Sequence, residues 1–308
     1  MTTTDWDIST LQGDGGRQRK ERRIKAIMLG AASASIVVSA LILYSLVFEA
    51  LKFIADVDFA TLVDIGWFPR RGIFDLRTIV AATLIVTAIA MAVAAPLGLA
   101  AAVYLSEYAD PRTRKILKPV LEVLAGVPSV VLGYFALRFI APNIVSNLFS
   151  TAKPANLAAA GIGVGLLTIP LIASISEDAL SAVPKALREA SSGLGARKKT
   201  TTLRIVLPAA ISGLTAAFIV ATSRAIGETM VVYIAGGAAD SAIQTYNPLD
   251  PGLTMTAAMA SVASGTDNIA GSGLTFQSLF FVGFLLFLMT MTMNLIADRF
   301  VRRYRQEY

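Results

Sequence analysis

The chain has 308 residues, of which 55% are hydrophobic and 16% charged, with a mean hydropathy of +0.65 and a net charge of +6. These values exclude an ordinary soluble domain, and the positive charge does not indicate nucleic-acid binding, because Lys and Arg lie in short clusters between apolar runs. Since the chain has neither cysteine nor histidine, disulfides, thiolate catalysis and metal sites built from these residues are excluded.

The first predicted element is a membrane helix over residues 26–48, which contain no charged residue. A helix needs about 20 apolar residues to cross the hydrocarbon core, and this run is long enough. It also exceeds the roughly 7–15 apolar residues of a signal peptide, so we expect it to stay uncleaved. The polar leader, residues 1–25, is predicted to be a poorly ordered cytoplasmic tail.

Five further membrane helices follow, which gives an all-α integral membrane protein with six transmembrane helices. Residues 26–304 are predicted to form one transmembrane domain, followed by a short cytoplasmic tail, residues 305–308. The third and fifth predicted helices carry charged residues, whereas the others carry none. The five predicted ranges are 78–106, 119–140, 155–176, 205–235 and 268–297.

The third predicted helix is interrupted at Gly126 and Pro128. Proline removes a backbone donor and kinks a helix, while glycine allows close helix contact. Two interpretations are open. The interruption is either a packing kink, or a broken helix whose freed backbone groups and the Ser129 hydroxyl line a substrate path.

The distribution of Lys and Arg predicts the orientation in the membrane. If the N-terminus is cytoplasmic, the cytoplasmic segments hold twenty of the 27 Lys and Arg residues. Residues 236–277, in the last outer loop, hold none. Both termini are therefore predicted to be cytoplasmic, and the long outer loop is predicted either to dip back toward the pore or to present a docking surface.

A basic segment, residues 178–204, separates the fourth and fifth helices on the cytoplasmic side. Pro184 suits a helix start, and Gly195 permits a positive backbone φ, so we expect two short helices joined by a turn at residues 193–195. Leu207 and Pro208 would then begin the next membrane helix. On composition alone, this segment is typical of a solvated basic loop that follows the excess of Lys and Arg in cytoplasmic segments.

Arg224 and Glu228 lie inside the fifth predicted helix, four residues apart, so their side chains can share one face. Charges at membrane depth are costly and generally mark substrate routes. Arginine also suits a tetrahedral oxyanion, because its planar fork donates two parallel hydrogen bonds. The alternative is structural: the pair joins two helices, or Arg224 extends toward the membrane interface.

The basic segment resembles the loop by which permeases of bacterial ABC importers dock on their ATPase subunits. Its residues match the pattern Glu-Ala-(Ala/Ser)-x3-Gly-x9-Ile-x-Leu-Pro at every fixed position. The resemblance implies a type I importer permease with a MetI-like core. It assigns the contact with the ATPase to six residues: Glu189, Ala190, Ser191, Gly195, Leu207 and Pro208.

Residues 223–230, Ser-Arg-Ala-Ile-Gly-Glu-Thr-Met, resemble the signature of the membrane subunits of the phosphate-specific ABC importer. Residues 104–109, 121–133 and 207–213 also fit that family, except that Leu132 stands where the family often has Tyr. The apolar residues after Thr229 favour its C-type (PstC) subunit over the A-type (PstA). The resemblance implies a phosphate path that includes Arg224, Glu228, Thr229 and Ser129.

The leading hypothesis is therefore a non-catalytic permease subunit in a bacterial inner membrane, which moves inorganic phosphate by alternating access. The resemblance implies a second, A-type permease, two ATPase subunits that bind ATP and Mg, and an external phosphate-binding protein. No cofactor or nucleic acid is expected on this chain, which lacks a Gly-x4-Gly-Lys-(Ser/Thr) motif. Alternatives are a permease for sulfate, molybdate or phosphonate, an A-type phosphate subunit, an ion-coupled secondary transporter and a membrane scaffold or sensor.

Overall fold

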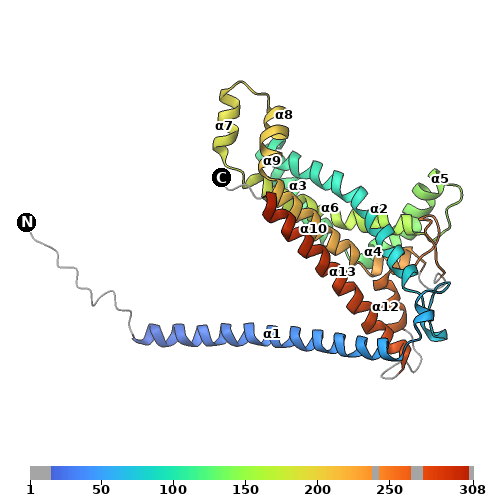
Figure 1. Cartoon of the computed structure of the whole chain (residues 1–308). Helices are drawn as coiled ribbons and strands as arrows, with labels where there is room; N and C mark the ends of the chain where they lie inside the picture. Colours follow the sequence, from blue (N-terminus) through green and yellow to red (C-terminus); the bar gives the residue numbers. More distant parts are fainter. Residues whose placement is uncertain (1–14, 238–242, 265–272, 305–308) are drawn as a thin grey trace, which may run out of the picture. The chain divides into compact units, whose positions relative to one another are not determined.

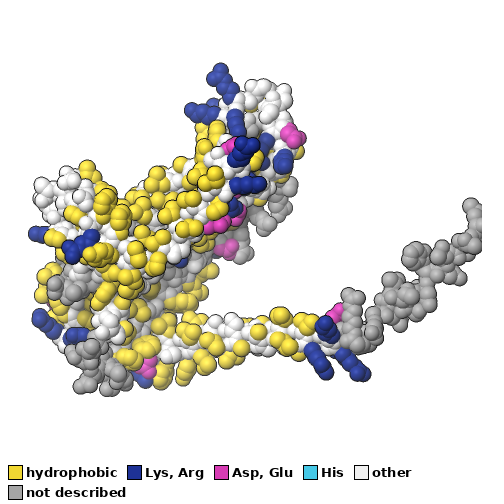
Figure 2. Space-filling view, turned by 180° about the vertical axis from the view of Figure 1, so that it is seen from behind, with side chains coloured by type: hydrophobic (Ala, Val, Ile, Leu, Met, Phe, Trp, Pro, Cys, Tyr) yellow, Lys and Arg dark blue, Asp and Glu magenta, His cyan; other side chains and the backbone are white. Residues whose placement is uncertain are grey.

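The computed structural model describes residues 15–237, 243–264 and 273–304, and it divides the chain into two compact units, residues 1–49 and 50–308. In the first unit, a single helix, α1 (Gly15–Asp56), continues across the unit boundary. Side chains 19–45 are all exposed, and most of them are apolar, as expected of a helix surrounded by lipid. Figure 2 shows hydrophobic side chains along this helix and Lys and Arg at its beginning.

The second unit is built around two long helices, α2 (Leu76–Val103) and α6 (Leu157–Ser181), which pack along each other. Small residues allow this close approach. A Cβ on Gly161 would lie 2.7 Å from Cβ of Ile89, and one on Gly165 would lie 3.0 Å from the carbonyl oxygen of Ala90. The pair is extended by α10 (Ile211–Ile226) and α13 (Leu274–Tyr304), which also run between the two ends of the unit (Figure 1).

The third crossing differs from the predicted range 119–140. The chain forms a separate amphipathic helix, α3 (Pro111–Ala125), breaks at residues 126–128, and then crosses as one helical run over residues 129–148. Pro128 lies at the break because it cannot donate a backbone hydrogen bond to the preceding turn. The crossing comprises α4 (Ser129–Phe135), the π-helical segment η5 (Ala136–Val145) and α5 (Ser146–Leu148).

The fifth crossing is also broken, so the prediction of one helix over residues 205–235 is wrong. A first stretch ends in the π-helical segment η6 (Thr202–Val206) and α9 (Leu207–Ala209), and a bend of 70° separates it from α10. Leu207 and Pro208 thus end the stretch before the bend rather than begin the membrane helix. The chain breaks again at residues 227–229 before α11 (Met230–Ala235).

The end of the unit opposite α7 (Lys185–Gly193) and α8 (Lys198–Thr201) holds short elements and part of the long loop over residues 236–277 (Figure 1). Within the loop, α12 (Met255–Ala263) returns to the core: the amide of Met255 donates to Thr83 Oγ1 at 3.0 Å. This contact brings part of the loop back to α2, in agreement with the first of the two alternatives for the loop; residues 238–242 and 265–272 lie outside the described chain. The remaining elements here are η2 (Phe59–Leu62), β1 (Trp67–Phe68), η3 (Pro69–Arg71) and β2 (Ile73–Phe74).

Within the described residues, five helices are long and apolar enough to cross a membrane, and the bent pair that ends in α10 makes a sixth. The surface between the two ends of the second unit is rich in hydrophobic side chains (Figure 2). The all-α membrane fold is therefore confirmed. The bounds of the third and fifth crossings are corrected.

Candidate functional site

The basic segment forms a helical hairpin at one end of the second unit (Figure 1). It consists of α7 (Lys185–Gly193) and α8 (Lys198–Thr201), and η6 continues from α8. Gly195 has a φ of +76°, and its amide donates to the carbonyl of Ser192 at 2.9 Å. The prediction of two helices joined by a glycine turn is confirmed.

The hairpin is held together at its base and exposed at its tip. The hydroxyls of Ser191 and Thr201 lie 2.8 Å apart and are buried, so Ser191 joins the two arms. Leu187 packs against a buried apolar cluster that includes Leu180 and Val206. Leu194, at the tip, is 90% exposed.

Arg188 ties the hairpin to the membrane helices. Its guanidinium donates to the carboxylate of Glu107, with Nη2 2.8 Å from Oε1, and to the carbonyls of Val183 and Leu180 at 2.6 and 2.8 Å. Glu107 lies in the π-helical segment η4 (Tyr104–Tyr108), which continues α2. Arg188 therefore connects α7, the end of α6 and the end of α2.

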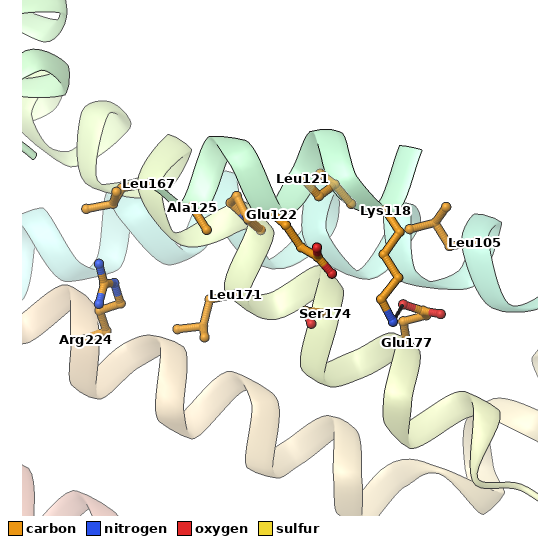
Figure 3. Close-up of a pocket in the computed structure, with 11 residues that line it drawn as sticks. Leu105, Lys118, Leu121, Glu122, Ala125, Leu167, Leu171, Ser174, Glu177 and Arg224 are labelled. Atoms are coloured by element: carbon orange, nitrogen blue, oxygen red, sulfur yellow. Dashed lines mark ion pairs between the residues drawn. The ribbon is translucent and has the colours of Figure 1, made fainter. Parts of the chain in front are cut away.

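A cavity of about 260 Å³ lies beside α6 and contains Arg224. Arg224 extends from α10 toward Leu167, while α3 contributes Lys118, Glu122 and Ala125 (Figure 3). No hydrogen bond or ion pair in the described part of the chain engages the guanidinium of Arg224. An exposed positive charge with unused donors therefore faces this cavity.

The opposite end of this cavity holds a buried carboxylate, that of Glu177, which is 1% exposed. Lys118 Nζ lies 3.0 Å from its Oε2, and Arg114 pairs with its Oε1. The hydrogen bond with Glu177 raises the pKa of Lys118 above its usual value, so its ammonium stays protonated throughout the physiological range.

The structure does not place Arg224 and Glu228 on one helix face. Helix α10 ends at Ile226 and the chain turns at Gly227, so the i, i+4 geometry is lost. The carboxylate of Glu228 instead lies 3.5 Å from the amide of Val231, at the start of α11, and its carbonyl accepts a hydrogen bond from Thr256. The expectation of an Arg224–Glu228 pair on a continuous helix is therefore wrong.

The other expected site residues lie near helix ends rather than in the cavity. Thr229 precedes α11, and Ser129 is the first residue of α4; neither lines the space beside Arg224. Gly126 and Pro128 form the break between α3 and α4. Of the expected contacts with the ATPase, Glu189, Ala190, Gly195 and Pro208 are exposed, Leu207 is half-buried and Ser191 is buried.

Sequence reasoning missed Lys118, Glu177 and Leu194. Lys118 lies in a basic cluster that the topology rule accounts for, and Glu177 lies just beyond the uncharged run of the fourth helix. Each of these two charged residues directly adjoins an apolar run, and that position is the signal that could have identified Lys118 and Glu177. Leu194 lies inside the matched loop pattern, at a position that the pattern leaves free.

Residues 94–306 match the family described as the binding-protein-dependent transport system inner membrane component. The chain belongs to this family. It is therefore a multi-pass inner-membrane permease of an ABC importer, and a non-catalytic subunit.

Two relatives and one solved structure agree with this assignment. The chain is 30% identical over 263 residues to the probable ABC transporter permease protein YqgH of Bacillus subtilis, which covers 83% of this chain and 82% of the relative. It is 30% identical over 264 residues to the phosphate transport system permease protein PstC of Mesorhizobium japonicum, covering 80% and 79%. A bacterial ABC transporter involved in the import of alginate matches in fold, with a TM-score of 0.65, 14% identity and coverage of 94% of this chain and 100% of that chain. The predicted fold of an importer permease is confirmed.

Proposed function

We propose that this permease translocates inorganic phosphate, and that it is the C-type subunit of its importer. Its partners would be an A-type permease, two ATPase subunits that hold ATP and Mg, and an external phosphate-binding protein. The N-terminus, the hairpin and the C-terminus would lie in the cytoplasm. Support for phosphate comes from residues 223–230 and from relatives such as the PstC protein of Mesorhizobium japonicum.

One observation carries the proposal: the unengaged guanidinium of Arg224 faces a cavity beside the membrane-spanning part of α6. The planar guanidinium can donate two parallel hydrogen bonds, so an oxyanion that brings two acceptor oxygens gains a bidentate contact. The cavity volume, about 260 Å³, is sufficient for one tetrahedral oxyanion. Most of the remaining lining is apolar, which limits the number of binding positions for the anion and so favours its release.

In this proposal, the hairpin couples transport to ATP hydrolysis on the partner subunits. Its exposed tip, with Leu194 and Gly195, suits a cleft on an ATPase subunit, and Glu189 offers a charge beside it. Movement of the ATPase subunits would shift the hairpin and, through Arg188, the ends of α2 and α6. Because α6 lines the cavity with Arg224, this shift would alternate access to the anion.

The competing proposals differ in substrate or in driving force. A permease for sulfate, molybdate or phosphonate would keep the hairpin but would not share the sequence motif of residues 223–230. An A-type subunit would carry different residues after Thr229. A secondary transporter would not need the exposed hairpin.

The test measures uptake of radiolabelled phosphate by membrane vesicles that contain the whole importer. Arg224→Gln removes the charge and the fork and should abolish uptake, while Arg224→Lys, which keeps only the charge, should retain a small fraction. Arg112→Gln is the matched control, because Arg112 is an exposed cation on α3 that lines none of the described cavities.

Competition with excess sulfate, molybdate or phosphonate identifies the substrate. Phosphate alone should compete in the wild-type importer. Uptake of phosphate at the normal rate by the Arg224→Gln importer, or inhibition by another oxyanion at lower concentration than phosphate, would refute the proposal.

A further inference from the structure

We propose that Lys118 is a second anion contact, which receives the oxyanion from Arg224 at the other end of the same cavity. This inference rests on the proposed function, and it adds a binding residue on α3. Figure 3 shows the arrangement: Arg224 lies at one end, and Lys118, with Glu177, at the other. The wall between them is mostly apolar and includes Leu121, Ala125 and Leu171.

The apolar wall restricts where an anion can rest. Between the two cations, the polar side chains that line the cavity are Ser174 and Glu122. Ser174 offers one hydroxyl, and the carboxylate of Glu122 repels an anion at short range. Because the middle of the cavity disfavours the anion, the two favourable positions are its ends, beside Arg224 and beside Lys118.

Lys118 is free to change partners because Glu177 has two cations. Removing one partner of a buried ion pair is costly when it leaves the other charge alone. Here Arg114 pairs with Oε1 of Glu177, whereas Lys118 lies against Oε2. If Lys118 turns toward an incoming anion, the buried carboxylate keeps Arg114, so the exchange leaves no unpaired charge.

The other charges near Lys118 are solvent-exposed and weaker partners. Asp178 lies 3.8 Å from Nζ, but its side chain is 71% exposed, so water screens the attraction. Glu122, one helical turn away on α3, is also exposed. The ammonium of Lys118, on a flexible four-carbon stem, can exchange between the carboxylate and an oxyanion with little backbone movement.

The space continues beyond Lys118, which gives the anion a way out. A second cavity, of about 540 Å³, shares Leu105, Lys118 and Glu122 with the first and is also lined by Arg114 and Lys115. A third cavity, of about 530 Å³, shares Arg114 and Ser106 with the second and reaches the base of the hairpin. Lys118 therefore stands where the membrane cavity joins a more open, basic region.

The test uses the whole importer in proteoliposomes, with phosphate delivered by its binding protein. Lys118→Met keeps the length of the side chain and removes its charge, and it should lower the maximal rate of phosphate uptake about tenfold, as expected from loss of one charge-assisted hydrogen bond. The KM for the phosphate-loaded binding protein should not change, because docking precedes this step. Lys118→Arg should keep at least half of the rate, and Arg112→Met, on the same helix, should keep all of it.

Assembly is measured in parallel as the amount of intact importer and its thermal unfolding midpoint, and rates are given per assembled importer. If Lys118→Met does not assemble, Lys118→Gln replaces it, because the amide can still donate to Glu177. If Lys118 only stabilised the fold, Lys118→Met would change the unfolding midpoint and leave the rate per assembled importer at the wild-type level. That result would overturn the inference. If Arg224→Gln still abolishes uptake in that case, the proposed function stands; if both variants transport normally, both proposals fail.

Discussion

Gly195 illustrates how a single backbone angle can determine the shape of a functional surface. Its φ is +76°, yet nothing lies within 4 Å of the point where a Cβ would be added. Steric contact with other residues is therefore not the constraint; the left-handed conformation is, and it costs a residue with a Cβ about 1–2 kcal/mol. Gly193, two residues earlier, is also unobstructed, but it has an ordinary helical conformation.

This contrast gives a matched pair of substitutions. Gly195→Ala should weaken the hairpin turn by about 1–2 kcal/mol and lower phosphate uptake, whereas Gly193→Ala should leave both unchanged or slightly improved. Gly195→Asp, which adds an anion to the same strain, should uncouple ATP hydrolysis from uptake. The measurements are phosphate uptake and ATP hydrolysis for each inserted variant. Equal behaviour of the two alanine variants would show that the turn does not matter for coupling.

The residues around the cavity show what sequence alone can and cannot predict. The position of Arg224 inside an apolar run predicted a functional role, and its side chain does line a cavity. The prediction that Glu228 shares a helix face with Arg224 was wrong. Residues four apart share a face only while the helix continues, and α10 ends at Ile226, before the break at Gly227. The pairing of Lys118 with Glu177 could not be predicted, since it depends on how α3 packs against α6 and the two residues are 59 apart in the chain.

At the scale of the elements, the sequence predicted the positions of the helices better than the positions of the breaks between them. Composition predicts where apolar runs lie, but not where the chain bends. Pro128 and Gly126 predicted an interruption, yet the structure shifts the crossing to residues 129–148 because α3, with its charged face, stays a separate helix. The bend of 70° before α10 follows directly after α9, which contains Pro208, and residues on both sides of it pack in one apolar cluster with Leu180 of α6.

The joint made by Arg188 is the element-scale feature that links the hairpin to the membrane helices. Glu107 is 7% exposed in its side chain and Arg188 is 24% exposed, so removing either partner leaves a largely buried charge. The cost of breaking a buried pair in this way is about 3–5 kcal/mol. Arg188 additionally donates to the carbonyls of Leu180, in the last turn of α6, and of Val183, just after that helix, which a lysine cannot do with the same geometry.

We expect Glu107→Gln and Arg188→Gln each to lower the amount of phosphate transported per ATP hydrolysed, while hydrolysis itself continues. The double variant Glu107→Gln/Arg188→Gln leaves no unpaired charge, so its loss should be smaller than the sum of the two single losses. Uptake and ATP hydrolysis are measured in the same proteoliposomes. Strictly additive losses, or losses of hydrolysis and uptake in equal proportion, would show that the pair only stabilises the fold.

At the scale of the whole molecule, composition alone predicted the class correctly. A chain that is 55% hydrophobic with long uncharged runs must fold in lipid, and the family match over residues 94–306 agrees with that prediction. What composition could not supply is the arrangement of the helices. That arrangement depends on small residues such as Gly161 and Gly165, which let α2 and α6 meet closely.

The orientation of the chain is testable with unusual clarity, because the sequence contains no cysteine. Single cysteines can therefore be introduced and labelled in intact cells with a membrane-impermeant maleimide.

Tyr246→Cys, at an exposed position in the last outer loop, should be labelled from outside. Lys20→Cys, in the basic start of α1, and Ser192→Cys, on the hairpin, should be labelled only after the membrane is permeabilised, because the excess of Lys and Arg predicts a cytoplasmic location for these segments. The cysteine-free chain is the background control. Labelling of Lys20→Cys in intact cells would reverse the proposed orientation of the N-terminus, and labelling of Ser192→Cys there would place the hairpin on the side that has no ATPase.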